Sequence, residues 1–211
     1  RGAAQLLDRE LSSEDQREYT RVIIDEADRL RSLVDRMLGP NKALKLAPTN
    51  IHEILERVGT LLEAESKGRL NFKRDYDPSI PEFKGDKEQL IQAFLNIARN
   101  AMEAAFENQA GHSSEEPPTI TFRTRTLRQF TIGNRRHKLV CRVDVIDNGP
   151  GIPPELVQNI FYPMISGRAS GTGLGLSITQ SIIGQHRGLV ECESEPGRTD
   201  FIIFLPLEDT P

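Results

Sequence analysis

A carboxylate at the end of a predicted strand is the first residue whose setting suggests chemistry. Residues 143–146, V-D-V-I, lead into Asp147 and then break at N-G-P-G, where Gly149 and Gly151 permit backbone geometries and close approaches that a side chain would block. The Asp147 carboxylate is therefore left facing any flat polar group that lies over the glycines. The alternative is a purely structural turn, because D-N-G is a common turn signal.

A second glycine string, G-T-G-L-G-L at residues 171–176, runs directly into a helical pattern. It presents backbone N–H groups together with the positive end of a helix, which is an anion site and most simply a phosphate site. The string lacks the Lys-Ser/Thr of a P-loop, and Leu176 stands where the dinucleotide fingerprint needs its last glycine. Taken alone, this segment also fits an ordinary loop.

Upstream, residues 86–106 have apolar positions spaced for a helix. That helix places Asn96 and Asn100 four residues apart on one face. Neutral amide oxygens are suitable ligands for a hard cation. The helix, the strand end and the glycine string together predict a nucleotide pocket.

These segments resemble, in order and spacing, the N, G1, F and G2 boxes of sensor histidine kinases: L-N-I-A-R-N-A-M-E-A, D-N-G-P-G-I, F-Y-P-M and G-T-G-L-G-L-S. Four further segments are similar to the nitrogen-regulation members of that family: R-G-A-A-Q-L-L, Y-T-R-V-I-I-D-E-A-D-R-L-R-S-L-V-D-R-M-L-G-P, R-D-Y-D-P-S-I-P and F-Y-P-M-I-S-G-R. The resemblance covers essentially the whole chain and is looser at residues 105–118 and 127–138.

The resemblance implies a role for each residue of the pocket. Asp147 accepts a hydrogen bond from the adenine amino group, so adenine is preferred to guanine, and Gly149 and Gly151 leave space for the ring. Asn100 ligates the Mg²⁺ that bridges the phosphates of ATP, with Asn96 beside it. The phosphate tail is held by the backbone amides of Gly171, Thr172, Gly173, Leu174 and Gly175.

Residues 162–170 are expected to form a lid over ATP, and lids are drawn from segments of low stability because they must open. Phe161 either anchors this lid by packing or is simply a core aromatic. Asn96 separates kinases from hydrolases. The resemblance places Asn96 where related ATPases of the gyrase, Hsp90 and MutL type carry a Glu that activates water, and an amide has no such basicity. Transfer to a protein nucleophile is therefore favoured.

In this family the nucleophile is a His in an H-E-x-x-N-P box, which the resemblance places just before R-G-A-A-Q-L-L. We therefore expect a fragment without its acceptor box, which His52, His112, His137 and His186 do not match. The resemblance implies an NtrC-like response regulator as recipient, phosphatase activity, and a PII-type signal protein as controller. The alternatives are a conformational ATPase of the same superfold and a non-catalytic nucleotide-binding interaction module.

The predicted fold is α+β in three parts. Residues 1–39 form a helical hairpin whose apolar seam is too narrow to bury alone, which predicts a homodimeric four-helix bundle; packing on the neighbouring domain is the alternative. Residues 40–50 form a linker. Residues 51–211 form the catalytic domain, an α/β sandwich of the histidine kinase/Hsp90-like (Bergerat) type.

Within that domain the pattern predicts one mixed sheet with helices on one face. Its expected elements are helices at 51–64 and 86–106 and a further helix closed by H-R-G at 186–188, with strands at 69–76, 119–126, 139–146, 189–193 and 200–205, the second and third strands being joined by a long hairpin.

Composition excludes several classes of protein. The 211 residues are 37% hydrophobic with a formal net charge of −4 and both signs interspersed, which gives no argument for nucleic acid binding. No apolar run approaches the roughly 20 residues of a membrane span. Cys141 and Cys192 lie in strand patterns and are typical of small core residues in a reducing compartment, so we expect a cytoplasmic protein.

Overall fold

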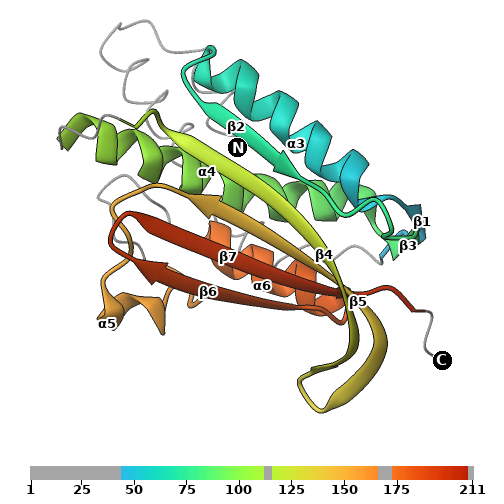
Figure 1. The fold of residues 1–211 in the computed structure, drawn as a ribbon. Coiled ribbons are helices and arrows are strands. Elements are labelled where there is room, and N and C mark those ends of the chain that lie inside the picture. The colour runs from blue at the N-terminus through green and yellow to red at the C-terminus, as the bar shows by residue number, and fades with distance from the viewer. Residues whose placement is uncertain (1–43, 112–115, 166–172, 209–211) are drawn as a thin grey trace, which may run out of the picture. The chain divides into compact units, whose positions relative to one another are not determined.

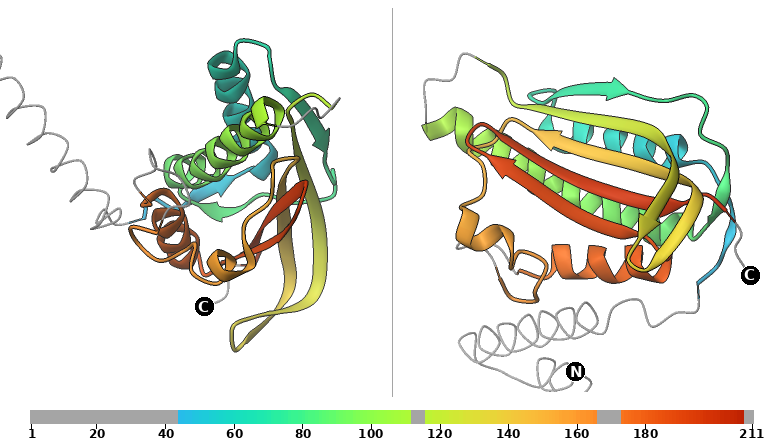
Figure 2. Two further views of the ribbon diagram at one scale, coloured as in Figure 1. Left: turned by 90° about the vertical axis from the view of Figure 1, so that its left-hand side faces the viewer. Right: turned by 60° about the horizontal axis from the view of Figure 1, so that its bottom comes forward.

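The computed structural model describes residues 44–111, 116–165 and 173–208, in which a mixed sheet carries helices on one face (Figures 1 and 2). The predicted helical hairpin of residues 1–39 lies outside the described residues. The strands are β1 Ala47–Thr49, β2 Asn71–Asp75, β3 Phe83–Gly85, β4 Thr119–Ile132, β5 Arg135–Asp147, β6 Leu189–Glu195 and β7 Arg198–Pro206. The helices are α3 Ile51–Ser66, α4 Lys87–Gly111, α5 Pro154–Val157 and α6 Gly175–Gln185.

The five-stranded sheet has the order β2-β4-β5-β7-β6, in which β2 and β4 are parallel and the other pairs antiparallel. Phe122, Val145 and Phe201 lie side by side in the register, and all three are buried. Along β4 and β5 such residues alternate with polar ones, which turns one face of the sheet toward the helices. The predicted α/β sandwich is therefore confirmed.

Helix α3 shows how the local sequence positions the helical layer. The Asn50 side chain accepts a hydrogen bond from the His52 N–H at 2.9 Å and caps the first turn. Lys67, in the left-handed conformation at φ 54°, ends the helix. The buried side of α3 and the apolar face of α4 supply the core beneath the sheet, including Ile54, Leu55, Val58, Leu62, Leu90, Phe94 and Ile97.

Several elements differ from the prediction. Helix α4 continues beyond residue 106 to Gly111. The predicted long hairpin is present with its tip at Gly133-Asn134, but its strands β4 and β5 extend to that tip, because the Arg- and Lys-rich stretch on either side hides the strand pattern. Residues 47–49, within the predicted linker, form β1 and pair with β3 in a separate two-stranded sheet. Short-range patterns do not reveal β1, since its partner is distant in the sequence.

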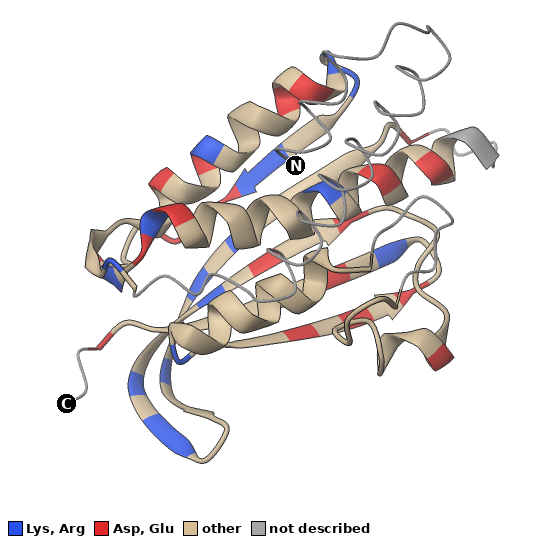
Figure 3. Ribbon diagram, turned by 180° about the vertical axis from the view of Figure 1, so that it is seen from behind, with Lys and Arg blue, Asp and Glu red and all other residues tan. Residues whose placement is uncertain are grey.

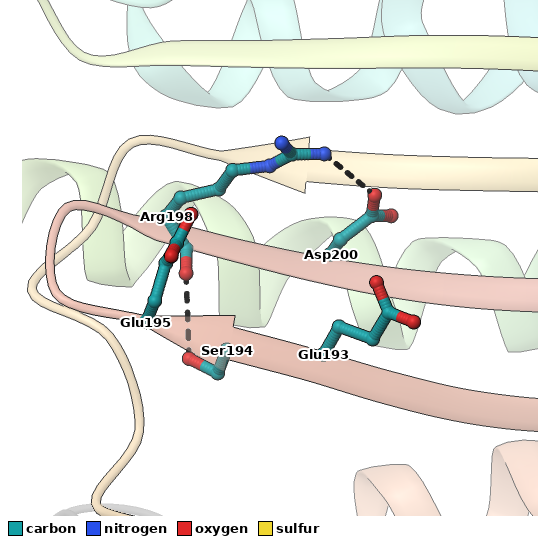
Figure 4. Close-up of a pocket in the computed structure, with 5 residues that line it drawn as sticks. All are labelled: Glu193, Ser194, Glu195, Arg198 and Asp200. Carbon is teal, nitrogen blue, oxygen red and sulfur yellow. Dashed lines mark hydrogen bonds and ion pairs between the residues drawn. The ribbon is translucent and has the colours of Figure 1, made fainter.

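On the face of the sheet away from the helices, Asp200 is buried in an unfavourable setting. Figure 4 shows Asp200 bonded to Arg198 at 3.0 Å, beside a pocket that is also lined by Glu193, Ser194 and Glu195. Among the described residues nothing donates a hydrogen bond to the second, buried oxygen of Asp200. Burial and the nearby Asp144 raise the pKa of Asp200, against a smaller lowering by Arg198. A buried carboxylate of this kind destabilises the folded state when it is charged.

We therefore expect Asp200→Asn to raise the melting temperature at neutral pH by about 2–4 °C for each kcal/mol gained. Because the pKa of Asp200 is higher in the folded than in the unfolded protein, the wild type gains stability from Asp200 as pH falls through that folded pKa, and loses it as pH rises. The Asn variant lacks this pH dependence because its side chain does not titrate. Thermal unfolding of both proteins between neutral and mildly acidic pH checks this, and a constant difference between their melting temperatures would contradict it.

Candidate nucleotide-binding site

The strand end that carries Asp147 is buried and tightly built. Asp147 is the last residue of β5, is 1% exposed, and accepts a hydrogen bond from the Gly149 N–H through Oδ1 at 2.8 Å. A Cβ at Gly149 would lie 2.6 Å from that oxygen and 2.7 Å from the Cβ of Ala104 on α4. Only glycine lets the turn pack on α4 at this distance.

The turn after Asp147 is fixed by the Asn148 side chain. Its Oδ1 accepts from the Thr119 N–H at 2.8 Å, and its Nδ2 donates to the Pro117 carbonyl at 3.0 Å. The Asn148 carbonyl accepts from Asn108 Nδ2 at 2.8 Å, which joins the turn to the last part of α4. Gly151 has φ +87°, and a Cβ there would lie 2.5 Å from the Glu195 carbonyl oxygen. The hydrogen bonds of the Asn148 side chain and the lack of space for a Cβ at Gly151 show why this segment is rich in Asn and Gly.

The two predicted asparagines lie on α4 between the turn and the first residues of α6. Asn96 Nδ2 donates to the Gly175 carbonyl at 3.2 Å, so the first turn of α6 lies against the middle of α4. Ala104, two turns further along the same face, contacts Gly149. Asn100 is half-buried and stands between these two contacts. Helix α4 thus brings Asn96, Asn100, Gly175 and the Asp147 turn to one side of the domain.

The glycine string enters α6 through a left-handed residue. Gly173 has φ +64°, its carbonyl accepts from the Met164 N–H at 3.0 Å, and a Cβ would lie 2.6 Å from the Met164 carbonyl carbon. Leu174 is buried, and its carbonyl accepts from Ser177 Oγ at 2.9 Å. Gly171 and Thr172 lie outside the described residues. The part of the string that the structure describes, residues 173–176, therefore runs directly into the N-terminus of α6.

Phe161 packs on the sheet. Its ring meets that of Phe201 edge to face, with centroids 6.5 Å apart and planes at 84°. Tyr162 and Met164, which follow it, are 62% and 69% exposed. Phe161 is only half-buried, so it is not a core aromatic, and its ring contact with Phe201 lies at the start of the predicted lid segment. Its role as an anchor of the lid stays a prediction. Residues 166–170 of that segment lie outside the described residues.

Sequence reasoning did not include Thr199 in the site. Thr199 on β7 lies directly opposite Asp147 in the register, is 3% exposed, and shares a hydrogen bond with Ser194 Oγ at 2.9 Å. Ser194 Oγ in turn accepts from the Ile152 N–H at 2.8 Å. The Thr199 and Ser194 hydroxyls therefore link the part of β7 beside Asp147 to the loop that follows Asp147. Only the pairing of β5 with β7 identifies Thr199, because nothing in its local sequence marks it.

Other chemistries are disfavoured by the surroundings of the described residues. Burial and the carboxylates of Asp147 and Asp200 raise the pKa of the Cys192 thiol to about 12, so it is no nucleophile at neutral pH. In the described part of the chain, no three His, Cys, Asp or Glu side chains form a group suited to a metal. A cation at this site would depend on amide oxygens such as that of Asn100 and on the oxygens of a bound ligand.

Comparisons with known proteins agree with this geometry. The family of "Histidine kinase-, DNA gyrase B-, and HSP90-like ATPase" matches residues 85–209, and the His Kinase A phospho-acceptor domain matches residues 1–43. "Sensory histidine kinase/phosphatase NtrB" of Vibrio alginolyticus is 52% identical over 98% of this chain and 57% of its own length, and that of Rhizobium meliloti is 39% identical over 98% and 53%. The chain thus spans little more than half the length of these relatives.

Solved structures show the same fold. The catalytic domain of histidine kinase ThkA is similar with a TM-score of 0.62 and 27% identity, covering 77% of this chain and 96% of that one. ThkA in complex with response regulator protein TrrA is similar with a TM-score of 0.65 and 25% identity, covering 98% and 56%. No helix among the described residues is long and apolar enough to cross a membrane. The chain belongs to the histidine kinase-, DNA gyrase B- and HSP90-like ATPase family and, through its two matched domains and its relatives, to the sensor histidine kinases within it.

Proposed function

We propose that this chain is the ATP-binding catalytic core of a sensor kinase that transfers the γ-phosphate of ATP to a histidine. One observation carries the proposal: a single face of α4 contacts both halves of the site. Asn96 on that face bonds to the Gly175 carbonyl, Ala104 contacts the turn after Asp147, and Asn100 lies between them. A nucleotide bound there would place its base at Asp147 and its phosphates at the N-terminus of α6. That end of α6 favours anions.

We assign each side chain one task. Asp147 would accept from the adenine amino group, and Asn100 would hold Mg²⁺ at the phosphates, where the metal would neutralise the charge of the transferred group. Asn96 donates its amide to the Gly175 carbonyl at 3.2 Å, so its amide supports the phosphate loop and supplies no base for water. Gly149 and Gly151 would lie beneath the base, and Gly171 to Gly175 would contact the phosphates.

The wider role is also a proposal. Residues 1–39 would dimerise and residues 51–211 would catalyse transfer to an acceptor histidine that is none of His52, His112, His137 and His186. An NtrC-like response regulator would be the next recipient in nitrogen regulation. Phosphatase activity and a PII-type controller are proposed from the names of the relatives. The solved complex of ThkA with response regulator TrrA supports a regulator as partner. Two free cysteines favour the reducing cytoplasm.

Phosphotransfer in trans tests the proposal. The chain is incubated with labelled Mg-ATP and a separately produced dimerisation domain that carries an intact acceptor box, and label is expected on the acceptor histidine of that domain. Steady ADP release without label on the acceptor would favour the conformational ATPase. Tight Mg-ATP binding without transfer or turnover would favour the interaction module.

Asn100→Ala is expected to weaken nucleotide binding in the presence of Mg²⁺ by about tenfold or more, while binding in EDTA changes little. The substitution removes only a metal ligand. The Asn100 side chain is half-buried, and the fold does not depend on a hydrogen bond from it to another described residue. Calorimetry with and without Mg²⁺ measures both affinities. Equal losses under the two conditions would remove Asn100 from the metal site.

A further inference from the structure

The segment from residue 117 to 143 is strongly basic. It contains no Asp or Glu, although the whole chain has a formal net charge of −4. Its cations are Arg123, Arg125, Arg128, Arg135, Arg136, Lys138 and Arg142. The segment therefore carries positive charge without any negative charge, and none of its cations has a role in the nucleotide site.

The distal part of this segment forms an arm beyond the sheet, which we define as residues 127–139. Strand β2 pairs with β4 only as far as Arg123, and β7 pairs with β5 only from Val140 onward. Within the described chain the backbones of the two arm strands bond to each other, apart from the Leu139 carbonyl at the base of the arm, which accepts from the Leu207 N–H at 3.1 Å. Figures 1 and 2 show them curling away from the remaining strands.

The arm is anchored by an apolar cluster of its own. Phe130 stacks on Phe204 with ring centroids 4.6 Å apart and planes at 19°. Ile132 packs with the buried Val140, Ile202 and Phe204. These contacts fix the arm against the outer face of the sheet, so a partner would not have to order it on binding.

The cations of the segment that lie outside the arm are paired with carboxylates. Arg123 and Arg125 pair with Asp75 at 3.0 and 2.7 Å, and Arg142 pairs with Asp144 at 2.6 Å. By contrast Arg128, Arg136 and Lys138 are exposed, and no carboxylate of the described residues pairs with them. Figure 3 shows the blue segments that these basic residues give the arm. The uncompensated positive charge of Arg128, Arg136 and Lys138 thus lies on the arm.

A purely protective role does not account for the sign of this charge. Exposed edges of strands are often guarded by charged side chains, which prevent pairing with other chains. A guard works with either sign, and the other end of the sheet has exposed carboxylates at Glu191, Glu193 and Glu195 on the edge strand β6. A run of one sign over 27 residues needs a further reason.

We propose that the arm is a docking surface for an acidic segment of a partner protein. Three uncompensated cations are few for a nucleic acid, since DNA-binding proteins make about 6–10 phosphate contacts. The carboxylates on β6 would also repel an extended polyanion. A protein can direct a short acidic segment at the arm alone, and the half-buried Leu127, Phe130 and Leu139 offer it apolar contact.

The arm and the nucleotide site lie at opposite ends of β5. From Leu139 to Asp147 the strand rises by roughly 26 Å at about 3.3 Å per residue. A partner on the arm therefore leaves the Asp147 pocket open. The proposal is thus independent of the activity proposed above, and nucleotide binding serves as a control for the fold.

The test is a titration of the full chain, labelled with ¹⁵N, by a short Glu-rich peptide at physiological salt. We expect saturable shifts confined to the amides of residues 127–139. The variant Arg128→Glu/Arg136→Glu/Lys138→Glu should bind the peptide about 30-fold more weakly, from three exposed ion pairs lost and replaced by repulsion. It should bind Mg-ATP as the wild type does.

A matched variant, Lys45→Glu/Arg57→Glu/Lys73→Glu, makes the same change in net charge at exposed positions outside the arm. It should keep most of the peptide affinity, and an equal loss would show that net charge alone is measured, which overturns the proposal. Tighter binding of a short DNA duplex or of phosphatidylglycerol vesicles than of the peptide would also overturn it. The variant Arg128→Gln/Arg136→Gln/Lys138→Gln tests protection of the strand edges. Aggregation of this variant with unchanged peptide affinity would overturn the proposal, since the cations would then only prevent pairing with other chains.

Discussion

Asp147→Asn is expected to reduce ATP affinity by about tenfold to a hundredfold while leaving the domain folded. A hydrogen bond to a charged acceptor contributes about 1.5–3 kcal/mol, and the Asn amide would in addition turn a donor toward the adenine amino group. The fold is expected to survive because Asn keeps an Oδ1 that can accept the 2.8 Å bond from the Gly149 N–H. Calorimetry measures the affinity, and circular dichroism checks the fold.

Two comparisons sharpen this result. GTP binding is the internal control, since guanine presents a carbonyl where adenine presents an amino group, and Asp147→Asn should narrow the preference for ATP over GTP. Thr199→Val tests the neighbouring hydroxyl, which lies opposite Asp147 in the register and bonds to Ser194 at 2.9 Å. Undiminished ATP affinity in Asp147→Asn would refute the pocket.

The parts of the site that sequence reasoning identified are those with local signals. Asp147 is marked by the strand before it and the glycines after it, and Asn96 and Asn100 by helical spacing. The structure adds the physical reason for three of the glycines, which is close contact with Ala104 at Gly149, with Glu195 at Gly151 and with Met164 at Gly173. These distances depend on packing between elements far apart in sequence.

The parts that sequence reasoning missed depend on long-range pairing. Thr199 becomes a neighbour of Asp147 only through the antiparallel pairing of β5 and β7. Strand β1 exists because Ala47 to Thr49 meet Phe83 to Gly85, and the Thr49 hydroxyl donates to the Gly85 carbonyl at 3.0 Å. The arm was predicted only as part of a long hairpin, because its charged residues conceal the alternation that marks a strand.

None of the three described histidines is placed to accept phosphate. His186 is 8% exposed, and both ring nitrogens are engaged: Nε2 accepts from the Asp86 N–H at 2.9 Å, and Nδ1 bonds to the Ile182 carbonyl at 2.8 Å. His137 is 3% exposed within the arm. His52 stacks on Tyr76 and bonds to Thr124 at 3.1 Å. His112 lies outside the described residues.

The 211-residue chain incubated alone with labelled Mg-ATP is therefore expected to stay unlabelled, even though it binds the nucleotide. Phosphoryl transfer needs a nucleophile held in line with the γ-phosphate, and effective molarities of about 10⁵ M or more show how far positioning determines the rate. His186 would have to break two hydrogen bonds and leave the core, and His137 lies on the arm at the far end of β5 from Asp147. Adding a dimerisation domain with an intact acceptor box should restore labelling, on that domain only. Acid-labile, alkali-stable label on the chain alone would show that one of its own histidines is an acceptor; His112→Gln would then separate the histidine outside the described residues from the three whose surroundings argue against it.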